Sequence, residues 1–306
     1  MQILVFGAGV IGSVYASKLL AAGHEVVLFA RGPRLADLRS GGLIMADAAS
    51  GTRATQPVMV VSELTQDDHF DLVLVAVRVE QLKGALPVLT GMHDGSDVLF
   101  LGNVGDCGLE LVTTLGGRAL FGFPAVGGSQ DGPAVRYVLI RQQMTMLGEP
   151  GGTMTPRVLR LQQVLAGAGF PTLVSADISG WLLGHAAFVV PIAFALYRVG
   201  IDATSLAADP ATMRLMVLAT REAFTVLQAV GNKEIPLNLR ALYRLPPFLI
   251  VAYWRWVLNG LRGELWFAAH SRAAPEEMHA LARHLEAAMR QARRPTPNLS
   301  QILASW

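Results

Sequence analysis

A glycine-rich stretch near the start of the chain has the residue spacing of a dinucleotide-binding turn. Gly7-Ala8-Gly9-Val10-Ile11-Gly12 follows a β-branched and aromatic run, Gln2 to Phe6, and precedes helical spacing from Ser13 to Ala22. In such a turn Gly7 permits the tight bend, Gly9 lets the backbone approach a pyrophosphate, and Gly12 allows close packing of helix on strand. A glycine turn without a ligand is the alternative. We predict a dinucleotide site with the binding residues Gly7, Gly9, Val10, Ile11 and Gly12.

The residue after the second predicted strand indicates which dinucleotide fits. An acidic side chain at this position accepts hydrogen bonds from the adenine ribose, but here the strand Glu25 to Ala30 is followed by Arg31. A guanidinium is always charged and binds phosphate in a bidentate manner, which suits a 2′-phosphate. We therefore predict NADP(H) as the cofactor, held by Arg31 with help from Arg34. An ordinary surface arginine is the alternative interpretation of Arg31.

Alternating strands and helices must position these residues. The run Leu72 to Val77 is continuously apolar, which is typical of a parallel strand buried on both faces. Repetition of strand and helix through the first half predicts an α/β fold with an N-terminal Rossmann-type doubly wound sheet. Val135 to Ile140 and Met144 to Leu147 are expected to add antiparallel strands to that sheet.

The second half of the chain is predicted to be entirely helical. Long helices, opened or closed by Pro, Gly, Asp or Ser, are expected over Ser179 to Tyr197, Ala211 to Val230, Pro247 to Leu258 and Pro275 to Arg290. We predict an NADP-binding Rossmann domain over 1–176 and an all-α substrate and dimerisation domain over 177–306. The active site is expected in the cleft between them.

Composition excludes several other classes of protein. The formal net charge is only +2, so no basic patch predicts a nucleic-acid partner. The single cysteine, Cys107, and the seven scattered histidines predict neither an internal disulfide nor a metal site, which fits a reducing cytoplasm. With 52% hydrophobic and 16% charged residues, the chain has ample material for a sizeable core.

A mean hydropathy of +0.41 requires a test for membrane segments. Ile3 to Leu20 contains glycine and small residues and lacks a basic n-region, whereas Pro247 to Leu261 is short and interrupted by Arg255. We interpret both as buried elements of a soluble cytoplasmic protein with no membrane span and no targeting signal.

Together with the glycine motif, five further segments resemble the ketopantoate reductase (2-dehydropantoate 2-reductase) family. In chain order they are Arg31, Leu74-Val75-Ala76-Val77-Arg78, Gly102-Asn103-Val104-Gly105, Ala229-Val230-Gly231, and Glu277-Met278, which lies twenty residues before Pro297. The resemblance covers essentially the whole chain. It implies a Rossmann domain followed by a helical domain, and NADPH-dependent reduction of a 2-keto acid to a 2-hydroxy acid.

The resemblance gives roles to three polar residues. Asn103 corresponds to the family's asparagine beside the nicotinamide and the substrate, and its amide can donate and accept hydrogen bonds; a turn-stabilising asparagine is the alternative. Arg78 stands where the family usually has lysine and can hold a phosphate or a carboxylate. Glu277 corresponds to an acidic residue that contributes to substrate and cofactor binding. An ordinary glutamate in the first turn of a helix is the alternative for Glu277.

The family's catalytic lysine has no counterpart in this sequence. In the family a tryptophan is followed two residues later by that lysine and then by two substrate-binding asparagines. Here Trp181 is followed at the corresponding positions by Leu183, Ala187 and Pro191. The only lysines of the chain are Lys18, Lys83 and Lys233, so a small shift of the alignment does not recover the proton donor.

His185 is the nearest titratable side chain to the missing lysine. An imidazole with an ordinary pKa of about 6.5 is a suitable general acid for carbonyl reduction, so we predict a catalytic role for His185 beside Asn103 and Glu277. On a helix His185 shares a face with Trp181, one turn earlier, and a hydrogen-bonded core histidine is the alternative. His270 is a second candidate.

The predicted function is NADPH-dependent reduction of a keto or imine group in a small molecule. Loss of the asparagines, and the aromatic segment Phe248 to Phe267, favour a substrate larger or less polar than ketopantoate. The competing hypothesis is a family member that binds NADP without hydride transfer, either a sensor or a cyclase or isomerase that reuses the site. A homodimer is also predicted, because the helical domain is apolar.

Overall fold

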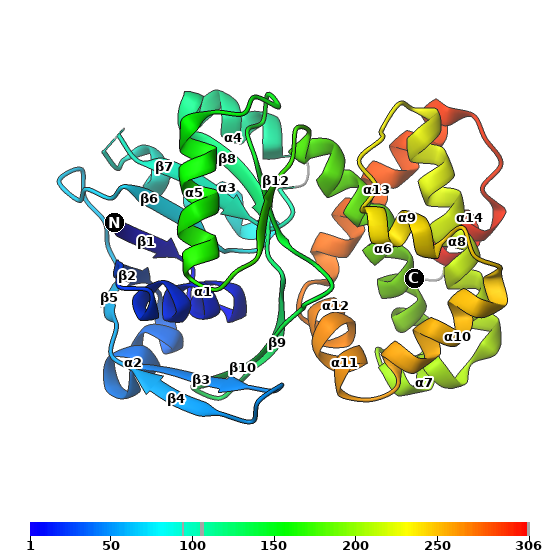
Figure 1. Cartoon of the computed structure of the whole chain (residues 1–306), viewed down its shortest axis with the longest axis horizontal. Helices are drawn as coiled ribbons and strands as arrows, with labels where there is room; N and C mark the ends of the chain where they lie inside the picture. Colours follow the sequence, from blue (N-terminus) through cyan, green and yellow to red (C-terminus); the bar gives the residue numbers. More distant parts are fainter. Residues whose placement is uncertain (94, 105–106, 305–306) are drawn as a thin grey trace. The chain divides into compact units, whose positions relative to one another are not determined.

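The computed structural model describes residues 1–93, 95–104 and 107–304, and these form two compact units. The first unit is Met1–Ile178 and the second is Ser179–Trp306. Figure 1 labels their helices and strands in chain order. Gly105 of the Asn103 motif, and Asp106, lie outside the described residues.

The first unit contains an eight-stranded sheet with the order β12-β11-β8-β7-β6-β1-β2-β5. The six strands from β8 to β5 run parallel, and the direction of winding reverses at β1. This arrangement confirms the predicted doubly wound sheet. The strands are β1 (Gln2–Phe6), β2 (Glu25–Phe29), β5 (Met59–Val61), β6 (Leu72–Val75), β7 (Asp97–Leu101), β8 (Ala119–Phe123), β11 (Thr145–Gly148) and β12 (Thr172–Val174).

Helices on both faces explain why the central strands are apolar along their whole length. All four residues of β6 are buried, as expected for a parallel strand covered on each side. The helices of this unit are α1 (Val10–Ala21), α2 (Gly32–Gly41), α3 (Val79–Thr90), α4 (Gly108–Leu115) and α5 (Pro156–Gly167), with a 3₁₀ turn at Gly116–Arg118.

A second, four-stranded sheet packs against α1, and it corrects one sequence prediction. Its order is β4-β3-β10-β9, with strands at Arg53–Gln56, Leu43–Asp47, Ala134–Leu139 and Val126–Asp131. The strand predicted at 135–140 was expected to extend the main sheet, but β10 pairs with β3 and β9 instead. The prediction for 144–147 is confirmed, because β11 pairs antiparallel with β8. Figure 1 shows β3, β4 and β10 below α1.

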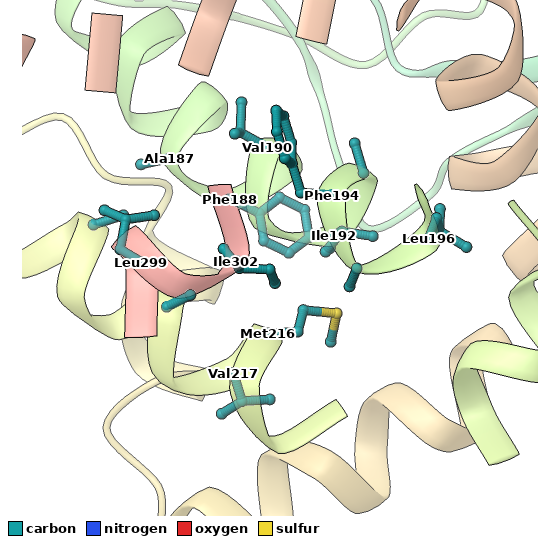
Figure 2. Packing of buried hydrophobic residues seen from close by; sticks show 14 of the residues in the cluster. Ala187, Phe188, Val190, Ile192, Phe194, Leu196, Met216, Val217, Leu299 and Ile302 are labelled. Carbon is teal, nitrogen blue, oxygen red and sulfur yellow. The ribbon is translucent and has the colours of Figure 1, made fainter. Parts of the chain in front are cut away.

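Every regular element of the second unit's described residues is a helix. Its elements are α6 (Ile178–Arg198, which starts at the last residue of the first unit), α7 (Ala203–Ala208), α8 (Pro210–Ala229), α9 (Leu237–Leu242), α10 (Pro247–Leu258), α11 (Leu261–Gly263), a π-helical turn (Glu264–Ala268), α12 (Ala269–Ala273), α13 (Pro275–Ala292) and α14 (Pro297–Leu303). Figure 2 shows apolar side chains of α6, α8 and α14, among them Phe188, Met216 and Leu299, gathered in one core.

Two apolar helices of the second unit differ in burial. By length and composition only α6 among the described helices could cross a membrane, yet 78% of its apolar window is buried inside the protein, as in a core helix. α10, predicted to be buried, packs Trp254 inward but leaves Phe248 and Trp256 70% and 62% exposed. The prediction is therefore wrong for the outer face of α10.

Candidate active site

The predicted cofactor residues of the first unit lie in a row at the carboxyl ends of four neighbouring strands. Arg31 follows β2, the glycine turn follows β1, Arg78 follows β6 and Asn103 follows β7. These strands are adjacent in the order β2-β1-β6-β7 and span about 15 Å at ordinary strand spacing. Parallel α/β sheets bind ligands at this edge, where the winding reverses.

The glycine turn has the shape that an approaching phosphate requires. A Cβ on Gly7 would lie 2.7 Å from the carbonyl oxygen of Ala76, and one on Gly12 would lie 1.8 Å from that of Gly7. A Cβ on Gly9, by contrast, would meet no atom within 4 Å. Gly9 is exposed and stands immediately before α1, whose first backbone N–H groups lack helical partners. Gly7 and Gly12 therefore permit close packing, whereas Gly9 keeps open space where an anion can approach, so the turn fits a dinucleotide.

Arg34 stabilises this turn through hydrogen bonds of its guanidinium, which the sequence did not show. Its Nε donates a hydrogen bond to the carbonyl of Ala8 at 3.1 Å, and its two Nη atoms donate to Ser13 Oγ at 3.2 Å and to the carbonyl of Pro133 at 2.7 Å. Ser13 Oγ in turn donates to the Ala8 carbonyl at 3.1 Å. Arg34 thus ties the glycine turn to the β9–β10 connection. The motif alone could not reveal this, because Pro133 is remote in sequence.

Arg31 is differently placed from Arg34. It is exposed, and its guanidinium lies over the ring of Phe29 at 4.9 Å from the ring centroid. Phe29 stacks on Phe6 with 4.4 Å between centroids, so the end of β2 offers a rigid apolar base. A long side chain resting on such a base keeps its charged head in water, where it can meet a phosphate.

Arg78 and Asn103 are the other two residues of the row, and they differ in exposure to solvent. The Arg78 side chain is 50% exposed and lies 3.8 Å from Glu80, an exposed ion pair of small energetic weight. Asn103 is buried immediately after β7. An amide held at a buried position can orient a ligand carbonyl or carboxamide with little loss of side-chain entropy.

The titratable residues predicted in the second unit come together from three helices. His185 comes from α6, His270 from α12 and Glu277 from α13, and both His270 and Glu277 act electrostatically on the His185 imidazole. His185 is 5% exposed and stacks on Trp181 with 5.3 Å between ring centroids, which confirms that the two share a helix face.

Burial changes what His185 can do. Loss of hydration lowers the pKa of His185 to about 3; the nearby His270 contributes in the same direction and Glu277 opposes it. The imidazole is therefore neutral near pH 7, whereas the sequence prediction assumed an ordinary pKa. A neutral imidazole has one N–H donor and one acceptor nitrogen, so it can orient a polar group.

Glu277 is a buried carboxylate, unlike its exposed neighbour Glu276. Its Oε1 lies 3.7 Å from Nε2 of His270, whose side chain is half exposed. Tyr197 is near as well: burial, followed by the Glu277 charge, raises the pKa of Tyr197 to about 12, and its hydroxyl donates to the Ser271 carbonyl at 3.1 Å. The sequence predictions did not include Tyr197.

Leu183, Ala187 and Pro191, which the resemblance predicts to stand where the family has lysine and asparagines, are apolar. Leu183 is partly buried, Ala187 is buried in the helical core, and Pro191 is buried as well. The only lysine of the second unit, Lys233, lies on the loop that packs against α6: Asn232 Nδ2 donates to the Gly180 carbonyl at 2.9 Å. Across the described residues no group of three or more His, Cys, Asp or Glu side chains could hold a metal ion.

Comparison with known proteins places this arrangement among reductases. Residues 3–151 match the family model described as Ketopantoate reductase PanE/ApbA. The 2-dehydropantoate 2-reductase of Mesorhizobium japonicum is 28% identical over 261 residues, which cover 76% of this chain and 77% of that protein.

Solved structures show the same fold over the whole chain. The 2-dehydropantoate 2-reductase of Geobacter metallireducens superposes with a TM-score of 0.80 at 17% identity, covering 100% of this chain and 98% of the other. D-mandelate dehydrogenase, solved with NADH and anilino(oxo)acetate, gives a TM-score of 0.77 at 15% identity, with coverage of 100% and 96%. The first half of the chain therefore matches the ketopantoate reductase family, and the chain has the fold of these reductases over its whole length.

Proposed function

We propose that this protein is an NADPH-dependent reductase of a small carbonyl compound. The observation that carries the proposal is the row of Arg31, the glycine turn, Arg78 and Asn103 along four adjacent strand ends, with open space at Gly9. In this proposal Arg31 binds the 2′-phosphate and the glycine turn with Val10 and Ile11 binds the pyrophosphate. Arg78 and Asn103 frame the nicotinamide and the substrate. The cofactor would supply the hydride.

Arg31 supports NADP over NAD because its guanidinium stands at the end of β2, where NAD-binding folds place a carboxylate. The test is titration of nicotinamide fluorescence with NADPH and with NADH, using the wild type and Arg31→Ala. The wild type should bind NADPH more tightly, and Arg31→Ala should lose most of that preference. An unchanged ratio of the two dissociation constants would remove Arg31 from the site.

The substrate class is proposed to be a 2-keto acid or related ketone with a larger or less polar substituent than ketopantoate. Apolar side chains at Leu183, Ala187 and Pro191 cannot hydrogen-bond a small polar substrate. A structural neighbour, D-mandelate dehydrogenase, was solved with anilino(oxo)acetate, whose oxoacetate group carries an aromatic substituent. The assay is NADPH oxidation at 340 nm with ketopantoate, branched and aromatic 2-keto acids, larger ketones and imines.

The same assay separates this proposal from binding without hydride transfer, which the missing lysine favours. Oxidation of NADPH by at least one carbonyl substrate, with the alcohol identified by mass spectrometry, supports the reductase. Tight NADPH binding with no oxidation across the panel supports a sensor, cyclase or isomerase instead.

We also propose a cytoplasmic homodimer. The single cysteine is consistent with a reducing compartment. Between Pro236 and Gly263 the sequence has four arginines and no acidic residue or lysine, and its exposed apolar side chains are Leu237, Leu245, Phe248, Leu249, Tyr253, Trp256 and Leu261. Aromatic residues and arginine are enriched, and lysine, glutamate and aspartate depleted, at protein interfaces. We propose that this aromatic face binds a second copy of the chain.

A further inference from the structure

Two histidines and one glutamate of the second unit lie close together but differ sharply in contact with water. His185 and Glu277 are buried, whereas half of the His270 side chain is exposed. His270 follows a π-helical turn, Glu264–Ala268, which changes the phase of the helical stretch just before it. Turns of this kind are frequent at functional sites. The cluster therefore has one member that can exchange protons with solvent and two that cannot do so directly.

An acidic side chain lies beside His270. The Glu277 carboxylate, 3.7 Å away on α13, attracts a positive charge on His270. From α6, His185 is neutral near pH 7 and Tyr197 remains a neutral phenol. On its own helical stretch the remaining charges pair with each other, since Arg272 Nη1 donates to Glu264 Oε1 at 2.8 Å. The Glu277 carboxylate is thus a counter-ion within salt-bridge distance of His270.

Local contacts also fix where His270 sits. Tyr197 donates to the carbonyl of Ser271, the next residue, and both Tyr197 and Ser271 are buried. Pro275 stands at the first position of α13, where its restricted φ angle favours the helical conformation. Glu277 lies in the first turn of this helix, next to α12. The imidazole and the carboxylate therefore sit on short, constrained backbone segments.

We propose that His270 is the catalytic residue that supplies the proton for carbonyl reduction, with buried Glu277 and neutral His185 as positioning residues, in place of the absent lysine. The inference rests on the proposed reductase function. In the step, the carbonyl carbon receives the hydride and the carbon–oxygen π bond breaks. The oxygen then takes the proton from the His270 imidazolium. The products are an alcohol, oxidised cofactor and a neutral imidazole, which regains its proton from water.

The alternatives for the proton donor are less suited by their surroundings. His185 is uncharged near pH 7 because it is buried, and it has no exposed edge of comparable size through which to recover a proton. Lys233 is an exposed residue of the loop that packs on α6, and no described contact holds its ammonium group toward the cluster. If His185 or Lys233 were the proton donor, the rates and pH profiles of the variants below would differ from those expected for His270.

The kinetic test compares His270→Gln, Lys233→Met and His279→Gln in the full-length protein. His279 is the matched control, because it lies on α13 and contacts the rings of Phe194 and Tyr197. His270→Gln should slow single-turnover NADPH oxidation by about 100-fold or more and abolish the fall in kcat/KM at alkaline pH, with NADPH affinity unchanged. The two other variants should keep the wild-type rate and pH profile.

Three outcomes would overturn the inference. The first is a wild-type pH profile in His270→Gln, which leaves the reductase function intact. The second is loss of the alkaline limb in Lys233→Met instead. The third is the absence of NADPH oxidation in the wild type across the substrate panel, which overturns the proposed function as well.

A second measurement needs neither cofactor nor substrate. Histidine Cε1–H resonances, assigned with the same variants, report the pH at which each imidazole loses its proton. In Glu277→Gln the His270 titration should move to lower pH, because the carboxylate that stabilises the imidazolium is gone. The His279 titration should move less. An unmoved His270 titration would show that Glu277 does not hold its charge and would contradict the inference.

Discussion

At the residue scale, two glycines of one motif act in different ways. Gly12 is pressed against the backbone of Gly7, whereas Gly9 faces open space. Gly12→Ala should lower the free energy of unfolding by about 3 kcal/mol, because the added methyl overlaps the Gly7 carbonyl. Urea unfolding measures this change.

Gly9→Ala should leave the free energy of unfolding within about 0.5 kcal/mol of wild type, since no atom meets the new methyl group. NADPH affinity should nevertheless fall by about tenfold or more, because the methyl occupies space that the pyrophosphate needs. Equal NADPH affinity in Gly9→Ala and wild type would mean that the phosphates do not lie over this glycine.

Arg34 and Arg31 also separate by experiment. Arg34→Met removes the hydrogen bonds that hold the Ala8 carbonyl and Ser13. It should weaken NADPH and NADH binding by a similar factor of about 10, because the turn that it fixes serves both dinucleotides. Arg34→Lys should restore only part of the affinity, since an ammonium cannot reproduce the planar fork. A selective loss of NADPH binding would instead make Arg34 a ligand of the 2′-phosphate.

His185 makes stability depend on pH in a defined direction. Its pKa falls from 6.5 in the unfolded chain to about 3 in the folded one, so the unfolded state binds more protons between those values. The stabilisation is complete above pH 6.5 and is lost progressively as the pH falls toward 3. Between pH 7.5 and 5 the wild type should lose about 2 kcal/mol relative to His185→Phe, measured by urea unfolding.

At the element scale, the position of α6 depends on the loop from Gly231 to Pro236. A Cβ on Gly184 would lie 2.3 Å from the carbonyl oxygen of Glu234, and Asn232 bonds the Gly180 carbonyl. This packing brings the loop onto the helix that carries Trp181 and His185. The glycine is needed here for close approach of the loop backbone, since its helical conformation would suit any residue.

Gly184→Ala should therefore destabilise the protein by about 2–3 kcal/mol, although alanine is the better helix former. The matched control is Gly84→Ala on α3, where an added Cβ meets nothing within 4 Å. That change should stabilise the protein by about 0.5–1 kcal/mol. Thermal unfolding of both variants compares the effects, and stabilisation by Gly184→Ala would show that the loop yields at this contact.

At the scale of the whole molecule, each unit has its own hydrophobic core, and the proposed cofactor row lies entirely within the first. The proposed dimer uses the aromatic face of the second. Arg262 already lies over Trp256 at 4.5 Å from the ring centroid, a contact that could also form between two copies.

Trp256→Glu should weaken the dimer by about 30-fold or more, because a buried tryptophan at an interface commonly contributes about 2 kcal/mol. Sedimentation velocity over a range of concentrations measures this change. Met59→Glu, at an equally exposed apolar residue of β5, should leave association unchanged. A monomeric wild type, or a dimer indifferent to Trp256→Glu, would exclude this face.

The doubly wound sheet, the helical second half and the resemblance to ketopantoate reductases could be predicted from the sequence, because hydrophobic period and glycine spacing are local properties of the chain. The same resemblance predicts that Leu183 stands where the family has its lysine. The second sheet was missed, since β10 pairs with β3, far away in sequence, and no local pattern specifies that partner. The exposure of α10 and the hydrogen bonds of Arg34 were not predicted either, because both depend on contacts with residues that are remote in sequence.

Tertiary structure alone decided the chemical state of the titratable residues. His185, His270 and Glu277 could be listed from the sequence, but their order of exposure could not, because hydration depends on which helices pack around each side chain. Burial makes His185 a neutral imidazole and leaves His270 beside the Glu277 carboxylate with access to water. Residue types therefore came from the sequence, whereas packing decided which of these side chains are buried and which charges lie beside them.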